Sequence, residues 1–465
     1  MRIDTDRIIE SAVCNLESVL NGVMVLGGYL TSFILYFTIN RILLAAVLIP
    51  LYLYKVLFSI FPSVIKNSPE IVKPGGWSRL ARNTERYRSR RDTFAHSQLE
   101  GTYRFKADEV FHIDRNSRGW MASVPWANNT HEFHVCGARV RYVHLQATHR
   151  TILQDGRSSH RPIVFLHGNP SWSYMWRDVF ASLLDRGHDI YALDWLGHGR
   201  SDKVLRREAI TFELHIRTLM EFFQATELQD AIIAAHDWGG CIALCTIPRL
   251  PIDTCDSLFL LNSFFPPRRS DESLHYRLLS RIWYCLTGLL HGYIPESAVV
   301  RFLAPHLSQE DIATYAAPYR DLPRSSKSSI ERFSHSVPSL PRFVLFNLRQ
   351  TYTWKVLEGL AGPEHFDSLS TQARLSAQGD QVRGFWGDRQ DDNELDVLVV
   401  CGDKDPIVRD YKSVLVRSMH PEHMVHWASR GLWIMGAGHL PMEERPGEVA
   451  GLIGKFAGGQ RMQAT

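Results

Sequence analysis

The sequence predicts an α/β protein with a mostly parallel, doubly wound sheet and an inserted helical cap, preceded by an N-terminal transmembrane segment. From about residue 131 onward, short apolar runs alternate with helical patterns, which is typical of parallel strands joined by helices. Residues 264–386 lack regular strands and are rich in aromatic residues, as expected for a helical cap. The chain has 465 residues, enough for a core and such additions.

The composition indicates a globular protein with a large core. Hydrophobic residues make up 45% of the chain and charged residues 22%. The net charge of +3 is too small to indicate a nucleic-acid partner, and we expect none. The seven cysteines are odd in number and show no pairwise spacing, so we expect buried free thiols. No C-x-x-C or H-E-x-x-H motif occurs, so we expect no metal and no cofactor.

Residues 1–66 are assigned to a membrane anchor that contacts lipid. The stretch 19–61 is almost continuously apolar, and a bilayer span needs about 20 such residues, so one span or two would fit. A cleaved signal peptide is the alternative. Its apolar part is only about 7–15 residues and follows a positive region, whereas the segment before residue 19 mixes acidic and basic residues.

Residues 67–130 are assigned to a basic linker and N-terminal extension. Lys and Arg are frequent between residues 66 and 91 and are opposed by few acids, and Pro74-Gly75-Gly76 is typical of a linker. Positive flanks of membrane spans stay cytoplasmic, so we expect the large C-terminal part on the cytosolic face.

Residues 131–263 are expected to form the first part of the core. Its strands are apolar runs bounded by turn residues, and one long helical pattern precedes the fifth of them. The expected strands cover 131–135, 140–145, 162–166, 190–194, 230–234 and 258–261, and the expected helix covers 212–226.

Asp237 stands between a strand pattern and a helical pattern, with Ala235 two residues before it and Gly239 two residues after it. This is the spacing of a nucleophile elbow, a strained strand–turn–helix corner that tolerates only small neighbours. A carboxylate at an elbow can attack an electrophilic carbon and form an ester, which water must later open. The alternative is a helix that simply begins with an Asp cap.

Residues 387–465 are expected to complete the core, with strands over 397–401 and 432–435. Opening an ester on Asp237 requires an activated water, for which His is the usual base and a second carboxylate the usual orienting group. His439 follows the last strand, and the order nucleophile, acid, His fits this architecture. Asp405 is the candidate acid. Asp403 is its competitor, although it lies nearer the strand end and could instead hold the turn.

Several motifs carry a family resemblance: HGNPSWSYMWRDV from His167, DWLGHGRSDK from Asp194, HDWGG from His236, GDKDP from Gly402 and GAGHLPMEERP from Gly436. On these motifs the chain, from about residue 131 to the C-terminus, resembles the α/β-hydrolase superfamily and specifically the haloalkane dehalogenases. The cap resembles that family loosely, mainly at Tyr315-Ala316-Ala317-Pro318-Tyr319, and residues 1–130 do not match.

The resemblance implies Asp237 as the nucleophile, His439 as the base and Asp405 as the acid. Family members place the acid after strand six or strand seven, and the strand-six position here is Asn262, which favours Asp405. The implied substrates are a small lipophilic haloalkane and water. The sequence gives no indication of the oligomeric state.

The resemblance also implies that Trp238 and Asn169 donate hydrogen bonds to the departing halide. An indole N–H and a side-chain amide supply two donors for the developing negative charge. The backbone N–H groups of the same two residues would form the oxyanion hole when water attacks the ester.

An epoxide hydrolase is the alternative, because that family shares the elbow and the HDWGG motif. It typically has an aromatic residue where Asn169 stands and uses two cap tyrosines to protonate the epoxide oxygen. The cap has several tyrosines: Tyr276, Tyr284, Tyr293, Tyr315, Tyr319 and Tyr352. A Ser esterase is disfavoured because the elbow lacks Ser. A non-catalytic ligand receptor on the same fold is a further alternative.

Overall fold

The computed structural model describes residues 91–113, 126–149, 160–266, 283, 287, 292, 294–334, 381–387, 395–425 and 428–458. These residues belong to one compact unit, Ser63–Thr465. The predicted anchor and residues 67–90 of the predicted linker lie outside the described residues. Within the described ranges, no helix is both long and apolar enough to cross a membrane.

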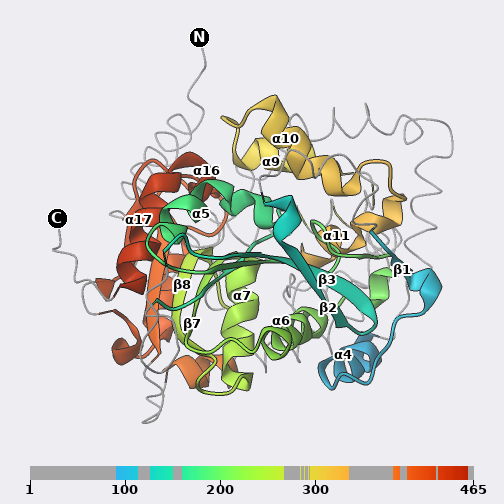
Figure 1. Cartoon of the computed structure of the whole chain (residues 1–465), viewed down its shortest axis with the longest axis horizontal. Helices are drawn as coiled ribbons and strands as arrows, with labels where there is room; N and C mark the ends of the chain where they lie inside the picture. Colours follow the sequence, from blue (N-terminus) through green and yellow to red (C-terminus); the bar gives the residue numbers. More distant parts are fainter. Residues whose placement is uncertain are drawn as a thin grey trace, which may run out of the picture. The chain divides into compact units, whose positions relative to one another are not determined.

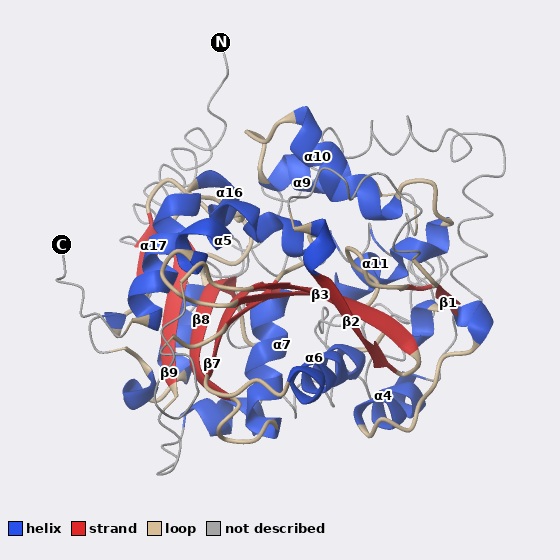
Figure 2. Ribbon diagram, in the orientation of Figure 1, coloured by secondary structure: helices blue, strands red, loops and turns tan. Residues whose placement is uncertain are grey.

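An eight-stranded sheet forms the centre of the described part (Figures 1 and 2), in the order β10-β9-β8-β7-β4-β5-β3-β2. Strand β3 pairs antiparallel with β2 and β5, and the other pairs are parallel, which confirms the mostly parallel sheet. The strands are β2 Thr130–Val135, β3 Ala138–Leu145, β4 Ile163–Leu166, β5 Ile190–Asp194, β7 Ala231–Asp237, β8 Cys255–Ser263, β9 Asp396–Gly402 and β10 Leu432–Ile434.

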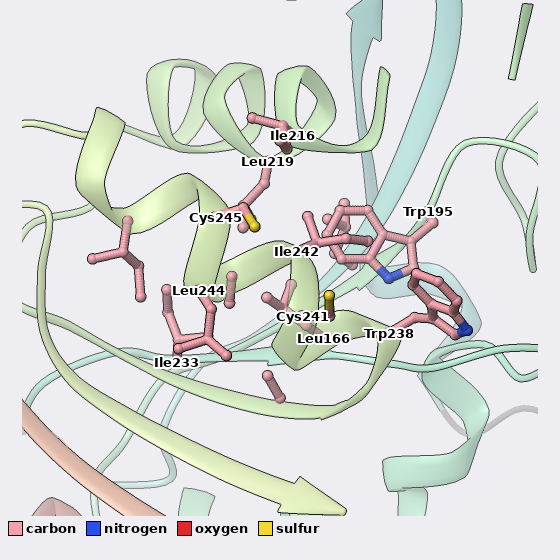
Figure 3. Close-up of a cluster of buried hydrophobic side chains, with 14 of the residues drawn as sticks. Leu166, Trp195, Ile216, Leu219, Ile233, Trp238, Cys241, Ile242, Leu244 and Cys245 are labelled. Carbon is pink, nitrogen blue, oxygen red and sulfur yellow. The ribbon is translucent and has the colours of Figure 1, made fainter. Parts of the chain in front are cut away.

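Helices cover both faces of this sheet, so its central strands are apolar on both sides. On β4, Phe165 packs against α5, where its ring centroid lies 5.3 Å from that of Phe180. Leu166 points to the opposite face and joins the apolar cluster with Ile242 and Cys241 of α7 (Figure 3). The helices are α5 Arg177–Leu184, α6 Phe212–Thr226, α7 Trp238–Thr246, α15 Tyr411–Ser418, α16 Pro441–Glu444 and α17 Pro446–Ala457.

The predicted strand 230–234 is too short at its C-terminal end. Strand β7 continues through Asp237, because His236 still pairs in register with Leu261 of β8 and Asp237 pairs with Ser263 after a register shift. Helix α7 accordingly begins at Trp238, two residues before the expected helical pattern. Asp237 therefore lies at the junction itself.

The predicted linker is folded over part of its length. Helix α4 covers Arg91–Leu99, and β1, Val110–Phe111, pairs antiparallel with β6, Lys203–Val204. Gln98 is fully buried and its Nε2 donates to the Ala209 carbonyl at 2.6 Å. These contacts attach α4 to the core near the start of α6, so this part of the N-terminal extension packs on the core.

The described part of the cap is helical, as expected. It contains α9 Glu296–Leu303, α10 Gln309–Ala316, the 3-10 helices η8 Ala317–Tyr319 and η9 Arg324–Lys327, and α11 Ser328–Ser334. In Figure 1, α9 and α10 lie above the sheet. Tyr319 Oη donates to the Gly197 carbonyl at 3.0 Å, and the Phe333 ring of α11 lies 5.2 Å from the His198 ring, so the cap contacts the loop that follows β5.

Candidate active site

Asp237 occupies a strained corner between β7 and α7. Its backbone has φ 53° and ψ −122°, a conformation that non-glycine residues rarely adopt. Although it stands at the N-cap position, its side chain makes no capping hydrogen bond, so the carboxylate is not used to start the helix. A Cβ on Gly239 would lie 2.7 Å from the carbonyl oxygens of Leu166 and His167, which explains the small residue there.

The Asp237 carboxylate is buried and meets backbone donors. Its Oδ1 receives a 3.1 Å hydrogen bond from the Asn169 N–H, and the Trp238 N–H also favours the ionised form. A Cβ on Gly168 would lie 2.5 Å from Asp237 Cβ, so only glycine lets the loop approach this closely. Burial raises the pKa of Asp237, while His439 and the two N–H groups oppose that rise. The arrangement can hold an oxyanion at Oδ1.

His439 lies between the two carboxylates. Its Nδ1 is 3.0 Å from Asp405 Oδ2, and its Nε2 is 3.7 Å from Asp237 Oδ2. A proton on Nδ1 is bonded to Asp405, which leaves the lone pair of Nε2 facing the Asp237 carboxylate. Burial disfavours the charged ring, but the charge and hydrogen bond of Asp405 outweigh it and raise the pKa of His439.

The structure brings Asp405, and not Asp403, to His439. Asp405 is buried, and its Oδ1 accepts hydrogen bonds from the Ile407 N–H at 2.6 Å and the Val408 N–H at 3.1 Å. Burial opposes ionisation, but His439 and these N–H groups hold the pKa of Asp405 below its usual value. Asp403 accepts a 2.5 Å hydrogen bond from the Gly436 N–H, so it links the loops that follow β9 and β10.

Asn262 is a residue of the site whose contacts the sequence did not predict. Its Nδ2 donates to Asp405 Oδ2 at 2.6 Å and to the Gly438 carbonyl at 2.9 Å, and its Oδ1 accepts from the Gly402 N–H at 2.9 Å. The amide thus connects the Asp405 side chain, the Asp405 loop and the His439 loop. The sequence signal that could have identified Asn262 is its location at the strand-six position, where some family members have the acid.

Asn169 has its side-chain amide held by two hydrogen bonds. Its Nδ2 donates to the Ile330 carbonyl at 3.0 Å, and its Oδ1 lies 3.2 Å from Nε2 of His198. An amide nitrogen has two hydrogens, and within the described residues Nδ2 makes one hydrogen bond, so its second hydrogen remains a donor.

Trp238 is the first residue of α7, and its indole packs against the aromatic rings of Phe264, at 5.0 Å, and Phe333, at 5.1 Å. Figure 3 shows the ring extending from the start of α7, with its nitrogen directed away from Cys241. The two residues expected to bind halide therefore both flank Asp237, one on each adjoining segment.

Reactive thiols and metal ligands do not form a second site within the described part of the chain. Its cysteines are free and buried, and burial raises the pKa of each thiol. In the same residues, no group of three or more His, Cys, Asp or Glu side chains could hold a metal ion.

Comparison with known proteins gives the fold. The family model for the alpha/beta hydrolase fold matches residues 161–283. The chain is similar to a haloalkane dehalogenase of Mycolicibacterium paratuberculosis, 31% identical over 192 residues, which are 41% of this chain and 60% of the relative. It is also similar to haloalkane dehalogenase 1 of Mycobacterium tuberculosis, 30% identical over 181 residues, which are 39% of this chain and 58% of the relative. The chain thus spans about 60% of the length of these curated relatives.

Solved structures agree on the fold. A haloalkane dehalogenase from Paraglaciecola agarilytica superposes with a TM-score of 0.52 at 18% identity, over 74% of this chain and 97% of that chain. A haloalkane dehalogenase from Agrobacterium tumefaciens gives a TM-score of 0.50 at 18% identity, over 74% and 99%. The chain has the α/β-hydrolase fold.

Proposed function

We propose that this protein, an α/β-hydrolase by fold with haloalkane dehalogenases among its relatives, cleaves carbon–halogen bonds through an ester on Asp237. The observation that carries the proposal is the arrangement around that carboxylate. Its Oδ1 accepts from the Asn169 N–H at 3.1 Å, and its Oδ2 faces Nε2 of His439 at 3.7 Å. A nucleophile, an oxyanion site and a base thus meet at one carboxyl group.

In the first step, Oδ2 of Asp237 attacks the carbon that bears the halogen. The new carbon–oxygen bond forms as the carbon–halogen bond breaks, and both electrons of that bond leave with the halide. The Trp238 indole N–H and one Asn169 Nδ2 hydrogen stabilise the departing anion. Such preorganised donors act strongly in a buried site, because water does not compete with them.

In the second step, water opens the ester. The lone pair on His439 Nε2 takes a proton from water, whose oxygen attacks the Asp237 carboxyl carbon, and the resulting oxyanion lies at the backbone N–H groups of Asn169 and Trp238. Asp405 stabilises the imidazolium through the 3.0 Å contact to His439 Nδ1. Collapse expels the alkoxide, which takes the proton from His439 Nε2 and leaves as the alcohol. The Asp237 carboxyl group then loses the second water proton to solvent and is again a carboxylate.

The described cap tyrosines favour this reaction over epoxide opening. Tyr315 Oη donates to the Glu443 carboxylate, and Tyr319 Oη donates to the Gly197 carbonyl at 3.0 Å, so neither hydroxyl is directed at an epoxide beside Asp237. Burial holds the pKa of both phenols well above the usual value. The other cap tyrosines of the alternative lie outside the described residues, so epoxides belong in the test.

The test is a substrate panel on the full chain. Chloro-, bromo- and iodoalkanes should yield halide and alcohol in equal amounts, with Asp237→Asn as the inactive control. Diol formation from epoxides without halide from any haloalkane would refute the proposal in favour of an epoxide hydrolase. Ligand binding without turnover of either class would refute it in favour of a receptor.

We also propose that residues 1–66 anchor the protein in a membrane, with the hydrolase domain on the cytosolic face. The apolar stretch 19–61 and the basic residues after it support this arrangement. The anchor would place the enzyme where lipophilic haloalkanes concentrate. Protease added to intact microsomes should digest residues 131–465 and leave a membrane-bound fragment. A protected hydrolase domain, or its recovery in the unsedimented fraction, would refute the proposal.

A further inference from the structure

The amide of Asn169 is held between the core and the cap. Its Nδ2 donates to the Ile330 carbonyl of α11 at 3.0 Å, and its Oδ1 lies 3.2 Å from Nε2 of His198, in the loop after β5. A carbonyl oxygen can only accept, so the amide atom that faces Ile330 is the nitrogen. The oxygen therefore faces His198, where it needs a donor.

We propose that His198 is a positioning residue for halide release. Its Nε2–H holds Oδ1 of Asn169, and this contact keeps the second Nδ2 hydrogen available to the halide that leaves beside Asp237. The inference rests on the proposed function. It adds a residue that does not touch the substrate and acts through Asn169.

The surroundings of His198 keep its ring fixed. The side chain is fully buried, and its ring centroid lies 5.4 Å from that of His167 and 5.2 Å from that of Phe333. Burial, together with the neighbouring imidazoles and Lys203, holds the pKa of His198 well below its usual value. A neutral ring carries one proton, so the nitrogen that bears it decides what Asn169 can do.

The competing position for that proton is Nδ1 of His198. The Leu196 carbonyl is the acceptor available to it, although within the described residues Nδ1 is buried without a hydrogen bond of acceptable geometry. A proton on Nδ1 would make Nε2 an acceptor that faces the acceptor Oδ1 of Asn169. The amide would then have to turn and lose its bond to Ile330. The contact to Ile330 therefore favours the Nε2–H form.

Three variants separate positioning from packing. His198→Leu fills the position with an apolar side chain and removes the N–H donor. His198→Gln instead supplies an amide N–H donor near the position of Nε2. His215→Leu is the matched control, because His215 is a buried neighbour whose two nitrogens make no hydrogen bond within the described part of the chain. Circular dichroism and thermal melting establish that each variant is folded.

We expect His198→Leu to lower the turnover number for a chloroalkane by about tenfold, the worth of about one net hydrogen bond. The loss should be smaller for the matching iodoalkane, whose leaving group depends less on hydrogen bonding. His198→Gln should recover most of the rate, and His215→Leu should leave it unchanged. In an Asn169→Ala background, His198→Leu should have no further effect. Equal losses in His198→Leu and His198→Gln, or a full loss in the Asn169→Ala background, would overturn the proposal.

A second measurement does not depend on turnover. Nitrogen-15 NMR of the full chain with labelled histidine distinguishes the two neutral forms of an imidazole, and the His198 signal is assigned by its absence from His198→Gln. We expect the proton on Nε2. A proton on Nδ1 would overturn the inference even if haloalkanes are hydrolysed, and absent halide release with an Nε2 proton would count against the proposed function alone.

Discussion

Asn262 Nδ2 donates to Asp405 Oδ2 at 2.6 Å, at the same carboxylate oxygen that lies 3.0 Å from His439 Nδ1. The proposed acid is therefore held by an amide that stands at the alternative position for an acid. This amide also bonds to the Gly438 carbonyl, so it fixes the distance between the loops of Asp405 and His439.

Removing the Asn262 side chain should slow turnover without unfolding the protein. Asn262 has a positive φ of 44°, which glycine adopts without strain, so Asn262→Gly isolates the loss of the amide from backbone strain. A hydrogen bond to a charged group is worth about 1.5–3 kcal/mol, so we expect the turnover number to fall by about 10–100-fold. Steady-state halide release measures it, and an unchanged rate would show that Asp405 is positioned by its backbone contacts alone.

Asp237→Asn should abolish turnover and leave the fold intact. The amide is a far poorer nucleophile of nearly the same size, and Asn tolerates the positive φ of this corner. Halide release and circular dichroism are the measurements. Activity above a trace level in a preparation free of deamidated protein would place the nucleophile elsewhere.

His439→Phe should allow the first step and block the second. Asp237 keeps the backbone N–H groups of Asn169 and Trp238 that favour its ionised form, but the variant lacks the proposed base that takes a proton from water. Mass spectrometry after incubation with a haloalkane should therefore reveal an alkyl adduct on the peptide that contains Asp237. The double variant Asp237→Asn/His439→Phe is the control and should remain unmodified. The two-step scheme fails if a substrate hydrolysed by wild type leaves no adduct on His439→Phe.

The pair of His439 and Asp405 should stabilise the protein within a defined pH range. The pKa of His439 is raised from 6.5, so the contribution of the charged ring to the free energy of unfolding is complete below pH 6.5. This contribution disappears as the pH rises through the raised pKa. The pKa of Asp405 is lowered from 3.8, so the contribution of the carboxylate to the free energy of unfolding is complete above pH 3.8. This contribution disappears as the pH falls through the lowered pKa. The difference in unfolding free energy between wild type and Asp405→Asn/His439→Phe should be largest between these values. A difference that does not vary with pH would contradict the ion pair.

The same pKa shift predicts the pH dependence of ester hydrolysis. The base must be neutral to take a proton from water. The rate of ester hydrolysis should therefore fall as the pH drops through the pKa of His439, which is raised above 6.5. Single-turnover decay of the adduct across pH measures this limb.

The sequence predicted the central sheet and the residues around Asp237 because both follow from local patterns. Parallel strands end at one edge of a sheet, so Asp237, His439 and Asp405, each just after or at a strand end, were expected to meet there. The structure brings them together within hydrogen-bond distance or slightly beyond it. The predicted strand ends were less accurate. Strand β7 continues through Asp237 because it pairs with β8, and no local pattern of the sequence indicates this pairing.

Contacts between distant segments could not be predicted in this way. Asn169 and Ile330 are 161 residues apart, and their hydrogen bond depends on how the cap docks on the core. The fold of residues 91–113 could not be predicted either, because a basic stretch is typical of a solvated linker. Only the structure shows that Gln98 is buried against the core. In both cases the information lies in tertiary packing and not in the periodicity of one segment.

Asn169→Ala separates haloalkane from epoxide chemistry. The side-chain donor disappears, but the backbone N–H that bonds to Asp237 Oδ1 at 3.1 Å remains, so the oxyanion site survives. Losing one donor to developing charge in a buried site typically costs on the order of 10²–10³ in rate, and we expect a loss of that size in chloride or bromide release. Decay of a preformed adduct should change little, because water attack uses the backbone donor. If wild type opens epoxides, releases no halide and is insensitive to Asn169→Ala, the dehalogenase proposal is wrong and the epoxide hydrolase stands in its place.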